Sequence, residues 1–231
     1  RQGQGHVSTY WDKLSDSERA ELTAQLERID PAQMNAIVRK ALEADAAARE
    51  AKEAKIEPPP ADSFVSTVDD AARAEQLRSR GLAAVGAGQV GVLLLAGGQG
   101  TRLGSSAPKG CYNIQLPSGK SLFQLQAERI ARLQKLAAQA AGRDQVVVPW
   151  YIMTSGPTRK PTESFFAEHR FFGLDPANVI FFEQGTLPCV TNEGKIMLDA
   201  PSRVATAPDG NGGLYAALRA PRAPGQGLSL I

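Results

Sequence analysis

The feature that most constrains the fold is a continuous apolar run followed at once by a glycine-rich loop. Residues 90–95 read Val-Gly-Val-Leu-Leu-Leu, a pattern typical of a strand buried on both faces of a parallel sheet. Residues 96–104 then contain four glycines, which let a backbone approach a ligand closely and ring an anion with amide groups. Since ligands of α/β sheets sit beyond the carboxyl ends of the strands, the sequence predicts an anion-binding site in this loop.

The following segments predict alternating helices and strands. An apolar stripe predicts a helix over 121–138, and apolar runs predict strands over 146–154 and 179–182, with a helix over 161–169 between them. Strand, helix, strand, helix, strand predicts a doubly wound, Rossmann-like, mostly parallel sheet covered on both faces. Asn-Glu-Gly-Lys at 192–195 predicts a hairpin turn.

The first part of the chain predicts a small helical appendage over residues 12–55. Ser15 and Glu18 have the spacing of a capping box, and Asp30-Pro31 has the pattern of a second helix start. Three prolines at 58–60 predict a stiff linker, and a shorter helix is expected over 69–80.

These patterns divide the chain into three expected regions. A helical N-terminal region covers 1–60, and the nucleotide-binding part of an α/β domain covers 61–218. Residues 219–231, rich in proline and glycine and without apolar periodicity, are expected to be a disordered tail.

Charge and hydropathy exclude several classes of partner. The 26 basic and 24 acidic residues give a net charge of +2, so neither a nucleic acid nor an anionic membrane surface is expected. The longest apolar run, 90–96, is far too short to span a bilayer. With no secretory signal visible and Cys111 and Cys189 expected as free thiols, a cytoplasmic protein is predicted.

Two common glycine motifs do not fit the loop. A dinucleotide fingerprint needs Gly-x-Gly-x-x-Gly, whereas Gly98, Gly100 and Gly104 have three residues in the second gap. A P-loop needs Gly-Lys-Ser/Thr, whereas here Lys109 precedes glycine. Arg102 and Lys109 instead add the fixed positive charge that a triphosphate or pyrophosphate would need.

Four motifs together carry a family resemblance. They are Leu-Ala-Gly-Gly-Gln-Gly-Thr-Arg-Leu-Gly at 95–104 with Pro-Lys-Gly at 108–110, Glu-Gln-Gly-Thr-Leu-Pro at 183–188, Ala-Pro-Asp-Gly-Asn-Gly-Gly-Leu-Tyr at 207–215, and the stretch around Tyr-Trp-Asp-Lys-Leu at 10–14. From about residue 4 to 218 the chain resembles the sugar-nucleotide pyrophosphorylases, a nucleotide-diphospho-sugar transferase type of fold. Gln99 and Gly110 make it similar to the eukaryotic UDP-N-acetylglucosamine pyrophosphorylases rather than to the UDP-glucose enzymes.

The resemblance implies roles for particular residues. Nucleotide-binding residues would be Leu95, Ala96, Gly97, Gly98, Lys109, Gln184 and Gly210. Arg102 and Lys109 would be catalytic, because they would hold the triphosphate and stabilise charge as pyrophosphate leaves. Gln184 would recognise the uracil edge, and Asn211 would bind the sugar.

The implied reaction is a uridylyl transfer. UTP and N-acetylglucosamine 1-phosphate would form UDP-N-acetylglucosamine and pyrophosphate, usually with Mg²⁺. The resemblance stops after residue 218, so the carboxylate that binds the metal in the family is not expected in this chain, and no metal-ligating residue is predicted. A half-sheet of this kind would leave an unpaired strand edge and an uncovered apolar face. Three alternatives stay open: a relative that uses another sugar 1-phosphate, an inactive truncated UTP-binding fragment, and an oxidoreductase domain, which the glycine spacing disfavours.

Overall fold

The computed structural model describes residues 3–50, 57–100 and 104–220. The chain divides into two compact units, one formed by Arg1–Ala61 with Thr186–Asp209 and the other by Asp62–Gly185 with Gly210–Ile231. Among the described residues, no helix has both the length and the apolar character needed to cross a bilayer.

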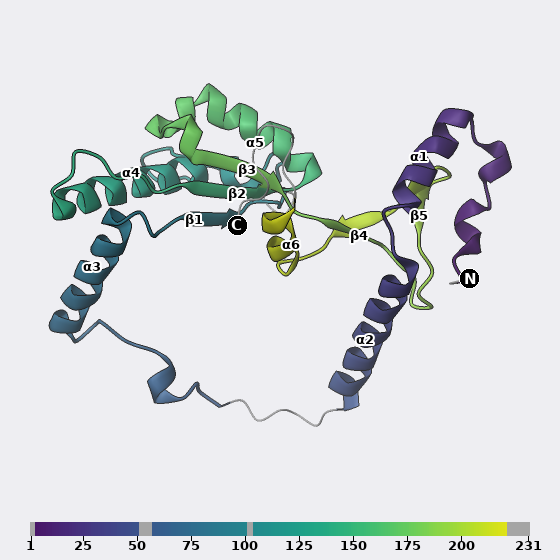
Figure 1. The fold of residues 1–231 in the computed structure, drawn as a ribbon, viewed down its shortest axis with the longest axis horizontal. Helices are drawn as coiled ribbons and strands as arrows, with labels where there is room; N and C mark the ends of the chain where they lie inside the picture. The colour runs from purple at the N-terminus through teal and green to yellow at the C-terminus, as the bar shows by residue number, and fades with distance from the viewer. Residues whose placement is uncertain (1–2, 51–56, 101–103, 221–231) are drawn as a thin grey trace. The chain divides into compact units, whose positions relative to one another are not determined.

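The second unit is built on a parallel three-stranded sheet (Figure 1). Its strands are β1 (Val92–Leu95), β2 (Trp150–Thr154) and β3 (Val179–Glu183), in the order β1-β2-β3. Helix α4 (Leu122–Ala141) connects the first two strands and α5 (Gly156–Glu168) connects the second pair. The expected α/β alternation and parallel sheet are therefore confirmed.

Both crossover helices cover the same face of the sheet rather than opposite faces. Right-handed crossovers between successive strands of one sheet place their helices on one side. There, the Phe166 ring of α5 packs edge-on against Phe123 of α4 and Trp150 of β2, with centroids 5.0 and 5.4 Å apart. On the other face of β1, Leu93 and Leu95 are 39% and 45% exposed, in agreement with the uncovered apolar face expected from the sequence.

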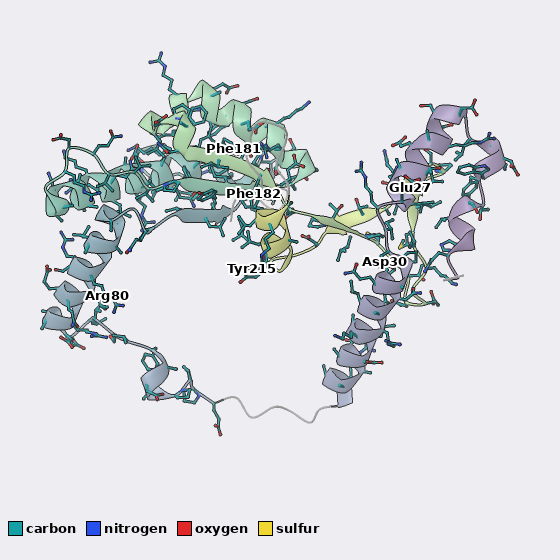
Figure 2. The ribbon with its side chains drawn as sticks, in the orientation of Figure 1. Glu27, Asp30, Arg80, Phe181, Phe182 and Tyr215 are labelled. Carbon is teal, nitrogen blue, oxygen red and sulfur yellow. The ribbon has the colours of Figure 1, made fainter. Side chains whose placement is uncertain are left out.

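Strand β3 contributes an aromatic side chain to each face of the sheet. Phe181 and Phe182 are neighbours whose side chains alternate across the sheet (Figure 2). The Phe181 ring meets Phe166 of α5 at 5.2 Å, whereas Phe182 is buried on the other face. Helix α6 (Gly213–Arg219) contacts this strand.

Helix α3 (Ala71–Gly86) begins at the capping residue Asp70, whose Oδ1 accepts from Arg73 N–H at 2.8 Å. The sequence placed its end at residue 80, but the helix continues through Gly81 to Gly86. There it packs tightly on α4, since a Cβ built on Gly86 would lie 3.1 Å from Ala141 Cβ. Packing between the two helices thus outweighs the low helix propensity of glycine.

Two other boundaries differ from the expected ones. Of the strand predicted over 146–154, only Trp150–Thr154 is a strand. Before it, the Pro149 carbonyl still accepts from Val92 N–H at 2.8 Å, but Pro149 has no N–H to donate and Val148 N–H donates to Gln134 Oε1 of α4 at 2.9 Å. The helix predicted over 161–169 begins already at Gly156, so Pro161 lies inside it. Short 3-10 turns lie at Gly5–Ser8, Trp11–Lys13, Ala61–Ser63, Lys109–Cys111, Arg170–Gly173 and Pro176–Asn178.

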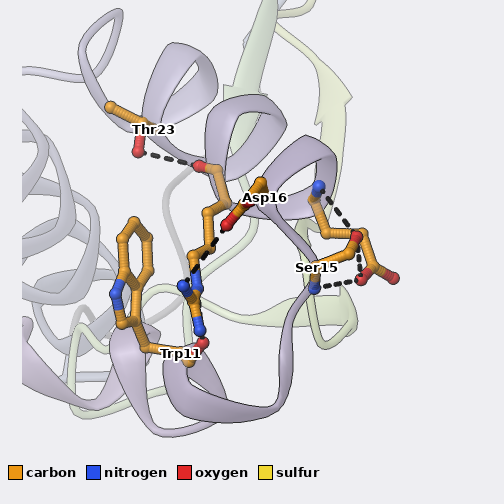
Figure 3. Close-up of polar contacts among 6 residues, drawn as sticks. Trp11, Ser15, Asp16 and Thr23 are labelled. Carbon is orange, nitrogen blue, oxygen red and sulfur yellow. Dashed lines mark hydrogen bonds and ion pairs between the residues drawn. The ribbon is translucent and has the colours of Figure 1, made fainter.

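The first unit begins with two helices whose starts follow the sequence patterns. Helix α1 (Asp16–Leu26) has the predicted capping box, in which Ser15 N–H and Oγ both donate to Glu18 Oε2 (2.8 and 2.7 Å) (Figure 3). Helix α2 (Pro31–Glu50) starts after Asp30, whose Oδ1 accepts two backbone N–H groups of the first turn. Both predicted helix starts are confirmed.

Two small antiparallel ribbons pack with these helices. They are β4 (Thr186–Pro188) with β7 (Thr206–Pro208), and β5 (Leu198–Ala200) with β6 (Arg203–Val204). The predicted turn at 192–195 is present, with Gly194 N–H donating to Thr191 O at 2.9 Å. The sequence boundaries placed 186–209 in the nucleotide-binding part, whereas their contacts group them with the N-terminal helices. A core of Val7, Leu14, Leu22, Ile196 and Val204 explains this grouping.

Candidate functional site

The glycine-rich loop leaves the carboxyl end of β1 and folds back on itself. Gly100 N–H donates to Ala107 O at 2.9 Å, and Lys109 N–H donates to Gly98 O at 3.2 Å. These bonds return Lys109 to the start of the loop. A charged side chain that is eleven residues further along the chain than Gly98 is therefore held beside it.

Gly97 and Gln184 are in close contact. A Cβ built on Gly97 would lie only 2.8 Å from Gln184 Oε1 and 2.9 Å from Nε2. Gln184 follows β3, and its N–H donates to Thr154 O at 2.9 Å, which extends the sheet pairing by one residue. Only glycine at position 97 lets the Gln184 amide occupy this place.

Gly97 and Gly98 also supply backbone donors. Within the described ranges, no hydrogen bond uses the N–H of either residue. The Lys109 side chain covers Gly98, with Nζ 3.6 Å from where a Cβ of Gly98 would be. Two free amides beside an exposed ammonium group form an arrangement suited to an anion.

Two buried hydroxyls support the loop from the start of α5. Ser155 Oγ donates to Gly97 O at 2.7 Å, and Thr158 Oγ1 lies 2.9 Å from Ser155 Oγ. Ser155 and Thr158 are 8% and 1% exposed. Sequence reasoning did not single out either residue. The only signal would have been a serine directly after a buried strand, where a side chain meets the loops of neighbouring strands.

The thiol beside the loop is not activated. Burial, with a smaller contribution from the carboxylate of Glu168, raises the pKa of Cys111 to about 11. A thiolate is therefore scarce at neutral pH, which argues against a cysteine nucleophile at this site.

Comparison with known proteins identifies the family. Residues 32–223 match the model of the UTP–glucose-1-phosphate uridylyltransferase family. The chain belongs to this family. It is 48% identical over 226 residues to UDP-N-acetylglucosamine diphosphorylase 2 of Arabidopsis thaliana, and this match covers 95% of the chain and 44% of the relative. It is 44% identical to UDP-N-acetylglucosamine pyrophosphorylase of Saccharomyces cerevisiae, over 94% of the chain and 46% of the relative.

A solved structure supports the same relationship. The uridine diphosphate N-acetylglucosamine pyrophosphorylase of Trypanosoma brucei, in complex with an inhibitor, aligns with a TM-score of 0.78 and 37% identity, over 99% of this chain and 45% of that one. The chain thus has the fold of this uridylyltransferase family, and it spans under half the length of the relatives it matches.

The structure brings together four of the predicted site residues: Gly97, Gly98, Lys109 and Gln184. Leu95 and Ala96 lead into this group at the end of β1. Gly210 and Asn211 lie at the start of α6, where their carbonyls accept from Gly213 and Leu214, and the described contacts do not bring them against Gly97. Arg102 lies outside the described residues.

The described residues do not fit a protein-built Mg²⁺ site. They contain no group of three or more His, Cys, Asp or Glu side chains placed to hold a metal ion. The charged side chain held at the loop is the basic one of Lys109, which suits an anion rather than a cation.

Proposed function

We propose that this chain forms the nucleotide-binding part of a uridylyltransferase. The enzyme would make UDP-N-acetylglucosamine and pyrophosphate from UTP and N-acetylglucosamine 1-phosphate. The observation that carries the proposal is the contact between Gly97 and the Gln184 amide, beside Lys109 and two backbone amides that have no partner among the described residues. The names of the relatives at 44–48% identity support the choice of sugar.

The contact supplies what recognition of a uracil base requires. A primary amide offers one acceptor and two donor hydrogens, which complement the N–H and carbonyl groups along the imide edge of uracil. Gly97 adds a flat surface without a side chain next to that amide. The nucleobase would therefore lie against Gly97, with its edge toward Gln184.

The phosphates would extend toward Gly98 and Lys109. Attack by the sugar-phosphate oxygen on the α-phosphorus forms the new P–O bond, and pyrophosphate leaves with the electrons of the broken bond. The protein contributes position and charge neutralisation rather than a covalent intermediate. Lys109 stabilises the charge on the leaving group, and Arg102 is assigned the same task.

Pyrophosphate release from the 231-residue chain tests this proposal. The chain is incubated with UTP, N-acetylglucosamine 1-phosphate and Mg²⁺, and a Lys109→Ala variant is measured in parallel. Loss of a charged group that stabilises the transition state is expected to lower kcat about 10²–10³-fold. Lys135→Ala, an exposed lysine on α4, is the matched control and should keep the wild-type rate.

Two further comparisons define the reaction. Glucose 1-phosphate and N-acetylgalactosamine 1-phosphate are assayed beside N-acetylglucosamine 1-phosphate. N-acetylglucosamine 1-phosphate is expected to give the highest kcat/KM. Omission of Mg²⁺ with added chelator should abolish release if the phosphates of UTP bind the ion, since the described residues offer no metal site of their own. UTP binding without release would assign this chain the binding role alone, and failure to bind UTP would contradict the proposal.

Recovery of the native protein in the cytosolic fraction is also expected.

A further inference from the structure

Ser155 connects the end of β2 to the loop that follows β1. Its Oγ donates to Gly97 O at 2.7 Å, while its N–H donates to Thr158 Oγ1 at 3.0 Å. Each hydroxyl has one proton. Since the Ser155 proton is used on Gly97 O, Thr158 Oγ1 is the donor of the 2.9 Å contact between the two hydroxyls, which is shorter than its 3.3 Å alternative to Ser155 O. The Gly97 carbonyl is thus held by a buried chain of two hydroxyls from a helix 58 residues away in sequence.

Thr154, the last residue of β2, fixes the position of Gln184 in the same way. Thr154 O accepts from Gln184 N–H at 2.9 Å, and Thr154 Oγ1 donates to Phe182 O at 2.9 Å. Thr154 is fully buried. Two consecutive residues, Thr154 and Ser155, therefore fix the positions of both Gln184 and Gly97.

The bond to Gly97 also orients the next amide. A peptide unit is planar and trans, so the Gly97 carbonyl and the Gly98 N–H point in opposite directions. With the carbonyl directed at Ser155, the Gly98 N–H, which has no partner among the described residues, is directed away from it, and the Lys109 side chain lies 3.5–3.6 Å from where a Cβ of Gly98 would be. Rotation of the peptide between Gly97 and Gly98 would move both the Gly98 N–H, which is the anion donor, and the Gly97 backbone, which contacts Gln184.

We infer that Ser155, supported by Thr158, is a positioning residue for recognition of the uridine nucleotide. It acts through Gly97 and Gln184, and the identity of the ligand rests on the proposed function. The carbonyl bond holds the glycine pair in the orientation that a uracil base and its phosphates require.

The test compares hydroxyl-deleting variants by titration calorimetry with UTP and CTP. Ser155→Ala is expected to bind UTP about tenfold more weakly, as for a lost buried hydrogen bond, and to lose part of its preference for UTP over CTP. Thr158→Val should change both in the same direction, whereas Thr158→Ser, which keeps the hydroxyl, should restore them. Thr162→Val is the matched control, because its buried hydroxyl has no partner among the described residues.

Nucleotide-free protein gives a second readout. ¹⁵N relaxation of Gly97 and Gly98 should show lower order parameters in Ser155→Ala than in wild type or Thr162→Val. Unchanged relaxation, or UTP and CTP affinities equal to those of wild type, would overturn the positioning role. If wild type binds no uridine nucleotide, the proposed function and the assigned ligand fail, while relaxation still decides whether Ser155 holds the peptide. Should Ser155→Ala not fold, the Thr158 pair carries the same comparison.

Discussion

The Cα of Gly110 lies against the ring of Phe123, so closely that a Cβ at position 110 would overlap three of the ring's carbon atoms. Phe123 is fully buried at the start of α4. In the sequence, the glycine after Lys109 favoured one family of sugar-nucleotide enzymes over another. The structure gives this glycine a packing role as well, because it lets the end of the loop dock on the core.

Gly110→Ala is expected to destabilise the second unit by about 1–3 kcal/mol, the usual cost of forcing extra volume into a packed site. Urea unfolding, followed by the fluorescence of the buried Trp150, measures the change. Gly81→Ala is the matched control. A Cβ there meets nothing within 4 Å inside α3, so alanine should stabilise by about 0.5–1 kcal/mol. Equal effects of the two substitutions would contradict the packing argument.

Gly97→Ala is expected to disturb binding more than stability. The new Cβ would displace the Gln184 amide, which is the mobile end of a side chain, so the fold should accommodate it. UTP affinity should fall at least tenfold, because the displaced Gln184 amide no longer pairs with the edge of the uracil base and the polar groups of that edge are left without partners. Gly98→Ala provides the contrast: its Cβ would meet Lys109 at an ordinary 3.5 Å, so a smaller loss is expected. A larger loss in Gly98→Ala than in Gly97→Ala would count against the Gln184 contact.

Cys111 should react slowly with iodoacetamide at pH 8. Its pKa is raised to about 11 by burial and by Glu168, and the thiolate is the reactive form. Since the thiol loses its proton only at higher pH, the alkylation rate should rise with pH up to about 11 rather than level off near 8.5. A Cys189→Ser background isolates the signal, and the same protein in denaturant should react on the order of 10²-fold faster at pH 8. A plateau below pH 9 in the folded protein would refute the shift.

The starts of α1, α2 and α4 could be predicted because their determinants are local, whereas the start of α5 at Gly156 was missed. Ser15, Asp30 and Ser121 each accept a backbone N–H within three residues, so the sequence contains the whole interaction. The end of α3 could not be predicted in this way. It depends on the packing of Gly86 on Ala141, a contact between residues that are far apart in sequence.

The same distinction applies to the units and the site. Residues 186–209 join the first unit through contacts such as the one between His6 Nε2 and Ile196 O at 2.7 Å, which spans 190 positions. The glycine spacing and Lys109 could be recognised in one short stretch. Ser155 was missed because its role appears only when the loop after β1 lies beside it. The roles of all the predicted site residues stay predictions, those of Gly97, Gly98, Lys109 and Gln184 as well as those of Arg102, Gly210 and Asn211.

The capping box of α1 gives a stability prediction for the first unit. Ser15→Ala removes the side chain that caps the helix and should cost about 1 kcal/mol. Hydrogen bonds from the Ser15 side chain and backbone lower the pKa of Glu18, so this contribution is present above the unfolded pKa of about 4.3 and is lost as the pH falls through the lowered folded value. The difference between Ser15→Ala and wild type should therefore be largest near pH 7 and shrink in acid. Urea unfolding at pH 7, 4 and 3, followed by far-UV circular dichroism, measures it, with the exposed Ser17→Ala as control. If both variants unfold at the same urea concentration at pH 7, the box does not stabilise the helix.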